Sequence, residues 1–286
     1  FYAMSMMGVL GIVLFFSCFF MTRERFTPRN DTSGSMIGDL KLLAANSQWR
    51  IVFLFNILLL TAVVTRGSAT MYYVKYVLLR PEMVFTFIVS GMLASLTGAL
   101  LSARLLGKFD RVRAYQWTII TFVIFAALIF IIPPSQVWLI FTLNIVFSFI
   151  QNLTTPLQWT MFSDVVDYEE HRSGRRLDGL VFSTALFAIK FGLALGGAVV
   201  GWVLGAVDYI PNQAQQSATV LTTINALFTL IPCLLFICMV LLLTRYKLNS
   251  SVADSIAQEL LQKRGGSNEA ADAQTTPDLS NTGVTR

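Results

Sequence analysis

Seven long apolar runs, separated by short polar segments, dominate this chain. A bilayer core needs about 20 apolar residues in a helix. The runs therefore predict an all-α membrane protein with about seven transmembrane helices. Their predicted spans are Phe1–Met21, Ile51–Leu79, Val84–Leu106, Ala114–Ile132, Val137–Phe162, Gly179–Ala206 and Ala218–Tyr246.

The polar segments divide the chain into four parts. Residues 1–21 form one transmembrane helix, and residues 22–50 form a polar central loop with five basic residues. Residues 51–246 hold a predicted bundle of six helices. Residues 247–286 form a polar tail, in which we expect a weak amphipathic helix from Val252 to Lys263 and disorder beyond it.

Composition and charge agree with a multi-pass membrane protein. Hydrophobic residues make up 55% of the chain and charged residues only 13%, whereas soluble domains carry about 25% charged residues. All but four of the 21 lysines and arginines lie in alternate loops and the tail. The positive-inside rule makes those loops and the C-terminus cytoplasmic. Because the basic residues sit between membrane spans, we expect no nucleic-acid partner.

Catalytic and metal-binding patterns are missing from the sequence. The three cysteines lie in apolar runs without metal-ligand spacing, and the chain has one histidine, His171. No nucleotide-binding G-x-x-x-x-G-K-S/T loop and no G-x-S-x-G motif occurs. We therefore expect neither an enzyme nor a cofactor.

Two cations lie deep inside predicted spans. Lys190 is about eleven residues into its span and Arg66 about fifteen into its own, and none of the 16 acidic residues lies deep in a span. A charge at this depth is costly and usually faces a cavity or a partner charge. We expect both to face the substrate cavity, with counter-charges from a preceding half of the protein or from an anionic substrate. Snorkelling to the membrane surface is the alternative.

The fifth span carries a polar stripe. Asn144, Ser148, Gln151, Asn152 and Thr155 lie on one helical face. We expect Pro156 to break the helix just before Trp159. Uncharged hydrogen-bonding groups beside an indole suit a sugar, and hydrogen bonding between helices is the alternative. The predicted cavity set is completed by aromatic residues near the outer end of the second span, Tyr72 and Tyr73.

A mixed-charge stretch, Asp164–Asp178, precedes the span of Lys190, and we predict that it is a cytoplasmic loop. We interpret Asp164, Asp167, Arg175 and Arg176 as an ionic latch on the cytoplasmic side, with a solvated face as the alternative. In the following span, glycines recur four residues apart and predict close contact with a neighbouring helix. They are Gly192, Gly196, Gly197, Gly201 and Gly205.

These features together resemble the glycoside–pentoside–hexuronide:cation symporters, which include the melibiose and glucuronide carriers. The resemblance rests on D-V-V-D-Y-E-E-H-R-S-G-R-R from Asp164, on Lys190 and the glycine-rich run after it, and on D-Y-I-P-N at Asp208–Asn212. Y-Y-V-K-Y at Tyr72–Tyr76 is also similar to that family. Two positions depart from it: Arg66, and Thr155-Pro156 where the melibiose carriers have an aromatic residue.

The resemblance implies the major facilitator fold, with this chain holding the sixth helix and the C-terminal six-helix half. The chain opens in apolar sequence at Phe1, and we expect it to be a C-terminal fragment. The resemblance also implies cation-coupled symport of a sugar, glycoside or sugar acid across the bacterial inner membrane by alternating access. The coupling ion would be H+ or Na+, from a site in the N-terminal half.

Lys190 would then face the central cavity, and Asp164, Asp167 and Arg176 would belong to a charge network between the halves. The expected partners are the substrate, a monovalent cation and membrane lipid, and the full-length protein would be a monomer. The alternative function is a sensor without transport activity or an uncoupled exporter of a sugar-derived anion.

Overall fold

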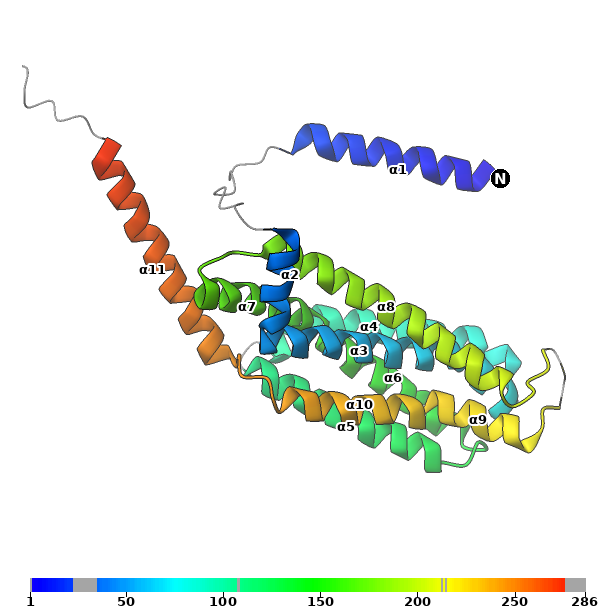
Figure 1. The fold of residues 1–286 in the computed structure, drawn as a ribbon. Helices are drawn as coiled ribbons and strands as arrows, with labels where there is room; N and C mark the ends of the chain where they lie inside the picture. Colours follow the sequence, from blue (N-terminus) through cyan, green and yellow to red (C-terminus); the bar gives the residue numbers. More distant parts are fainter. Residues whose placement is uncertain (1, 23–34, 107–108, 212, 214, 276–286) are drawn as a thin grey trace, which may run out of the picture. The chain divides into compact units, whose positions relative to one another are not determined.

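The computed structural model describes residues 2–22, 35–106, 109–211, 213 and 215–275. Its described elements are helical (Figure 1). In chain order they are α1 (Tyr2–Met21), α2 (Met36–Ala45), α3 (Ser47–Tyr72), η1 (Tyr73–Val77), η2 (Pro81–Met83), α4 (Val84–Leu106), α5 (Arg111–Ile131), α6 (Val137–Leu153), α7 (Thr155–Ser173), α8 (Asp178–Gly205), α9 (Ala218–Phe228), α10 (Leu230–Leu243) and α11 (Ser250–Thr275).

The predicted membrane spans are confirmed. Among the described residues, seven helical stretches are long and apolar enough to cross a bilayer. Helix α1 is one of them and forms a unit by itself, with none of its apolar stretch buried. The other six lie in the unit that begins at Met36, where α3 to α10 pack into a bundle (Figure 1). The protein is therefore an all-α, multi-pass membrane protein.

Helix α3 begins earlier than the sequence pattern predicts. The side chain of Asn46 accepts hydrogen bonds from the backbone N–H groups of Gln48 and Trp49, at 2.9 and 3.2 Å. This N-cap satisfies donors that the first turn leaves free, so the helix starts at Ser47 and not at Ile51. The predicted central loop also contains helix α2, and its residues 23–34 lie outside the described part of the chain.

Glycines allow two helix pairs to pack closely. A Cβ atom added at Gly192 would lie 2.8 Å from the carbonyl oxygen of Ile57, so α8 rests directly on the backbone of α3. A Cβ added at Gly98 would overlap the carbonyl oxygen of Phe149, so α4 rests on α6 in the same way. Small residues permit such contacts between membrane helices, and here they join α3 to α8 and α4 to α6.

Two of the six bundle spans are interrupted near a proline. Helix α6 ends at Leu153 and α7 begins at Thr155, with Pro156 in its first turn. This agrees with the break predicted at Pro156. The last span was predicted as one helix but is divided at Thr229 into α9 and α10. Pro232 explains this division, because proline has no N–H to donate to the carbonyl oxygen four residues earlier, which belongs to Phe228.

The predicted extents of the charged segment and the tail need correction. Asp164 to Ser173 is not a loop but the last part of α7, and Gly174, with a φ of 71°, caps the end of this helix. In the tail, α11 runs from Ser250 to Thr275 and is longer than the helix expected from Val252 to Lys263. Its buried residues Ala253, Ile256 and Leu260 recur at helical spacing and join the hydrophobic core, which explains why the segment folds. Residues 276–286 lie outside the described part.

Candidate functional site

Arg66 lies inside the bundle, with only 5% of its surface exposed. One terminal nitrogen, Nη1, donates a hydrogen bond to the carbonyl oxygen of Phe228 at 2.8 Å, and Nη2 donates to Oδ1 of Asn144 at 3.1 Å. The guanidinium carbon lies 4.0 Å from the ring centre of Phe147 and 3.9 Å from that of Phe228. Two neutral acceptors and two aromatic faces thus surround this charge.

The contact with Phe228 has a specific cause. Its carbonyl oxygen cannot receive a helical hydrogen bond from Pro232, so Arg66 supplies the missing donor at the break between α9 and α10. Tyr73 stacks on the Phe228 ring with 4.3 Å between ring centres. Arg66 therefore connects α3, α6 and the α9–α10 break. Proline four residues after Phe228 was the signal in the sequence that could have pointed to this site.

The polar stripe of α6 and α7 is divided between two environments. Asn144 is buried against Arg66, whereas Gln151, Asn152 and Thr155 are half-buried around the α6–α7 break. The Thr155 hydroxyl lies 3.3 Å from Oδ1 of Asn152. Trp159, one turn further along α7, is 45% exposed. The stripe thus presents an indole and several hydrogen-bonding groups beside a break in the backbone.

A buried amide pair was not predicted. Nε2 of Gln158 on α7 donates a hydrogen bond to Oδ1 of Asn56 on α3, and Asn56 Nδ2 donates to the carbonyl oxygen of Val52 at 2.7 Å. Asn56 is fully buried. A single asparagine within an apolar span was the available signal, since such residues usually face another helix. The pair ties the stripe-bearing α7 to α3.

Lys190 lies near the middle of α8 and its side chain is exposed. The buried face of this helix carries Ala188, Gly192 and Gly196, which pack toward α3. Lys190 lies on the opposite side, together with Gly197 and Gly201, where an added Cβ would meet nothing within 4 Å. The structure therefore separates Lys190 from Arg66: one cation is on the surface of the bundle and the other is inside it. Tyr72 contacts Tyr209 edge to face, with 5.4 Å between ring centres.

The predicted latch residues do form ion pairs. Arg176 lies within hydrogen-bonding distance of Asp167, Glu170 and Asp178, at 3.1, 2.7 and 2.7 Å. Burial by itself would lower the pKa of Arg176, but the carboxylates of Glu170 and Asp178 outweigh it and raise that pKa. Arg175 pairs with Asp39 of α2. The segment thus connects α7 to the start of α8 and to α2.

Asp164 belongs to a different group of charges. Both of its oxygens accept hydrogen bonds from Arg111 at the start of α5, at 2.9 and 3.0 Å. The other terminal nitrogen of Arg111 donates to Asp254 of α11 at 2.8 Å. A single arginine therefore holds α5, α7 and α11 together.

Glu169, which was not among the predicted site residues, is fully buried. It accepts hydrogen bonds from Asn46 Nδ2 at 2.7 Å and from Arg172 Nη2 at 2.9 Å. Since Asn46 also caps α3, Glu169 fixes the start of that helix against α7. Among the described residues, no group of three or more His, Cys, Asp or Glu side chains is placed to hold a metal ion.

Comparison with known proteins identifies the family. The model of the family described as MFS/sugar transport protein matches residues 1–250. The chain belongs to this family. The candidate glycoside/cation symporter YagG of Escherichia coli is 50% identical over 96% of this chain and 60% of its own length. This confirms the resemblance to the glycoside–pentoside–hexuronide:cation symporters.

Two more distant relatives carry names with different substrates. The isoprimeverose transporter of Lactiplantibacillus pentosus is 28% identical over 94% of this chain and 56% of its own length. The candidate 2,3-dihydroxypropane-1-sulfonate exporter of Salmonella typhimurium is 24% identical over 91% of this chain and 57% of its own length. The chain therefore spans less than two thirds of the length of these relatives. Its family is one of sugar and cation transporters.

Proposed function

We propose that the protein is a cation-coupled symporter of a sugar, glycoside or sugar acid. The family and the name of its 50% identical relative, a candidate glycoside/cation symporter, support this proposal. H+ or Na+ would be the coupling ion, and no further cofactor would be needed. The protein would act as a monomer in a bacterial inner membrane, with its C-terminus in the cytoplasm.

The observation that carries the proposal is the position of Lys190. It lies near the middle of a membrane-spanning helix, on the surface of the bundle, opposite the face that packs on α3. A lysine at that depth facing lipid would be costly. A water-filled substrate cavity between two transporter halves removes this cost, and alternating access would expose the cavity to each side in turn.

The α6–α7 break would supply the neutral part of the substrate site. Trp159 offers an apolar ring face, and Gln151, Asn152 and Thr155 offer hydrogen-bonding groups. Both features suit a sugar, whose rim carries hydroxyl groups. Arg66 takes a different place in this proposal, because its described partners are neutral and internal. Arg66 would stabilise the wall of the cavity through its hydrogen bond to Asn144. Lys190 would carry the charge that is exposed to the cavity.

The decisive experiment is coupled uptake by the full-length protein in membrane vesicles. Neutral glycosides, uronides and sulfonated sugars would be added separately, with and without sodium, while proton movement is recorded. We expect one substrate class to trigger ion movement. Lys190→Val should insert normally but lose coupled uptake, while Lys263→Val, which replaces an exposed lysine of α11, should behave as wild type. Normal coupled uptake by Lys190→Val would contradict the proposed role.

The second function is export of a sugar-derived anion without coupling, or sensing without transport. The name of the 24% identical relative, a candidate sulfonate exporter, favours its export form. Efflux of a sulfonated sugar from preloaded vesicles, with no associated ion movement, would support the exporter. Substrate binding with no flux in either direction would support the sensor.

A further inference from the structure

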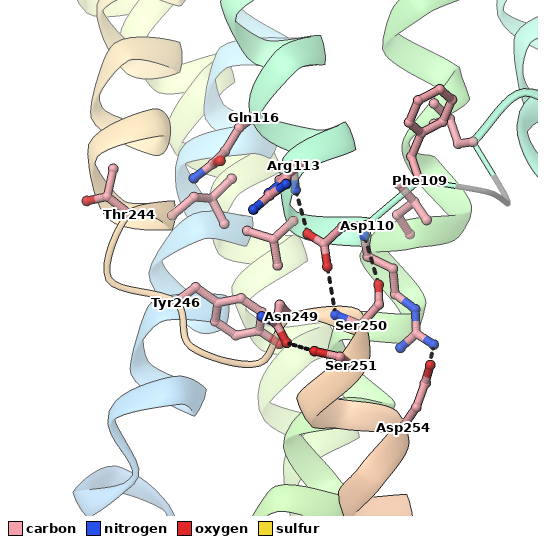
Figure 2. A pocket seen from close by; sticks show the side chains of 15 residues that line it. Phe109, Asp110, Arg113, Gln116, Thr244, Tyr246, Asn249, Ser250, Ser251 and Asp254 are labelled. Atoms are coloured by element: carbon pink, nitrogen blue, oxygen red, sulfur yellow. Dashed lines mark hydrogen bonds and ion pairs between the residues drawn. The ribbon is translucent and has the colours of Figure 1, made fainter.

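A groove lies beside α5, next to the end of α4. Its volume is about 540 Å³, and its wall is mainly apolar, with Leu106, Phe109, Trp117, Thr121 and Ile150. A second cavity of about 720 Å³ lies beside it, where α10 ends and α11 begins (Figure 2). Its lining is more polar and includes Gln116, Thr244, Asn249 and Ser251. Leu106, Phe109, Asp110 and Arg113 line both spaces.

The exposed face of α5 leads directly to Arg113. Trp117 is 69% exposed, and Ile124, Leu128 and Ile131 continue the same face toward the other end of the helix. Arg113 precedes Trp117 by four residues, one turn nearer the start of the span at Arg111. An apolar helix face that ends in a tryptophan and then a cation is the arrangement expected where acyl chains give way to lipid headgroups.

The charge of Arg113 is available to a ligand. Its side chain is exposed and forms no described ion pair, whereas the neighbouring Arg111 binds two carboxylates. Asp110 also lines both spaces, but its oxygens accept hydrogen bonds from the backbone N–H groups of Arg113 and Ser250, at 3.0 and 2.9 Å (Figure 2). The positive ends of α5 and α11 therefore meet at this carboxylate and stabilise it, and the charge of Arg113 contributes to the same effect.

We infer that the two adjacent spaces bind a phospholipid with an anionic headgroup. The headgroup phosphate would pair with Arg113 and occupy the polar cavity beside Gln116, and an acyl chain would lie in the groove against Trp117 and Phe109. In the proposed orientation this lipid belongs to the cytoplasmic leaflet. The site is distinct from the substrate cavity, so it depends on neither the transported substrate nor the coupling ion.

Lipid retention by the purified full-length protein tests this inference. The protein would be equilibrated with phosphatidylglycerol or with phosphatidylcholine of the same acyl chains, and bound lipids would be counted by native mass spectrometry. One lysine or arginine near an anionic membrane surface contributes about fivefold in affinity. We expect wild type to retain phosphatidylglycerol preferentially, and Arg113→Gln to lose about fivefold of that preference. Arg113→Lys, which keeps the charge, should retain most of it.

Two controls make the result specific. Arg245→Gln removes an exposed arginine that lines neither space and should keep the wild-type preference. Trp117→Ala, which opens the groove without changing charge, should weaken retention of both lipids. Equal retention of phosphatidylglycerol by wild type and Arg113→Gln would overturn the inference. Displacement of the lipid by inorganic phosphate would overturn it too, because it would indicate a site for a soluble anion. Retention requires no transport, so it can fail while the proposed function stands.

Discussion

The contact between α3 and α8 allows a quantitative test with adjacent glycines. A Cβ added at Gly196 would lie 2.9 Å from the carbonyl oxygen of Thr61 and 2.8 Å from Cβ of Val64, whereas a Cβ at Gly197 would meet nothing within 4 Å. Alanine at Gly196 therefore has to push the two helices apart. The Thr65 hydroxyl, 3.4 Å from the carbonyl oxygen of Gly196, would move with them.

The expected magnitude follows from two opposing effects. Overpacking a well-packed contact costs about 1–3 kcal/mol, and glycine to alanine in a helix returns about 1 kcal/mol. Gly196→Ala should thus lower the free energy of unfolding by as much as about 2 kcal/mol. Gly197→Ala should leave it unchanged or raise it by up to about 1 kcal/mol. The two variants add the same atoms one residue apart, so the difference between them isolates the helix contact.

Unfolding of the purified protein in detergent, followed by circular dichroism during denaturant titration, provides the measurement. The Cβ added by Gly192→Ala would lie 2.8 Å from the carbonyl oxygen of Ile57, so this variant should lower the free energy of unfolding as Gly196→Ala does. Equal stability of Gly196→Ala and Gly197→Ala would refute the reasoning, because it would mean that the α3–α8 contact adjusts without cost.

Three further predictions concern other contacts. Arg66→Met should destabilise the protein by about 1–3 kcal/mol for each acceptor left without a donor. Adding Pro232→Ala should recover part of the loss, because it restores an N–H at the α9–α10 break. Thermal unfolding of the single and double variants would show no recovery if Arg66 does not donate to the Phe228 carbonyl. Asp110→Ala should cost about 0.5–2 kcal/mol for each lost cap and should increase proteolysis at the start of α11, an effect that an unaltered cleavage rate would contradict. Burial would raise the pKa of Asp110, but hydrogen bonds from Arg113 and Ser250 outweigh it and lower that pKa. The stabilising contribution of Asp110 is therefore present above the unfolded pKa of about 3.9 and is lost as pH falls through the folded pKa. The stability difference between wild type and Asp110→Asn should shrink below about pH 4, and it would stay constant if the carboxylate were not responsible.

The periodicity of the chain was sufficient to predict its membrane spans, because a helix that crosses lipid must be apolar over its whole length. It could not show where the helices end on the aqueous side. Asp164 to Ser173 is highly charged and was predicted as a loop, yet it continues α7, since the buried Glu169 finds hydrogen-bonding partners in Asn46 and Arg172. The length of the helix in the tail was not predictable for a related reason. The tail has few apolar residues, and burying them stabilises α11 only because α7 provides a surface against which they pack.

The sequence alone also identified Lys190 and Arg66 as unusual, because any charge within an apolar run is conspicuous. Only the tertiary structure distinguished them. Arg66 lies where Pro232 leaves the Phe228 carbonyl without a donor, and Arg66 and Phe228 are 162 residues apart in the chain. Lys190 lies on the face opposite the glycines that rest on α3. Depth in the membrane is a property of position along one helix, and is therefore readable from sequence, whereas the direction that a side chain faces depends on which helices surround it.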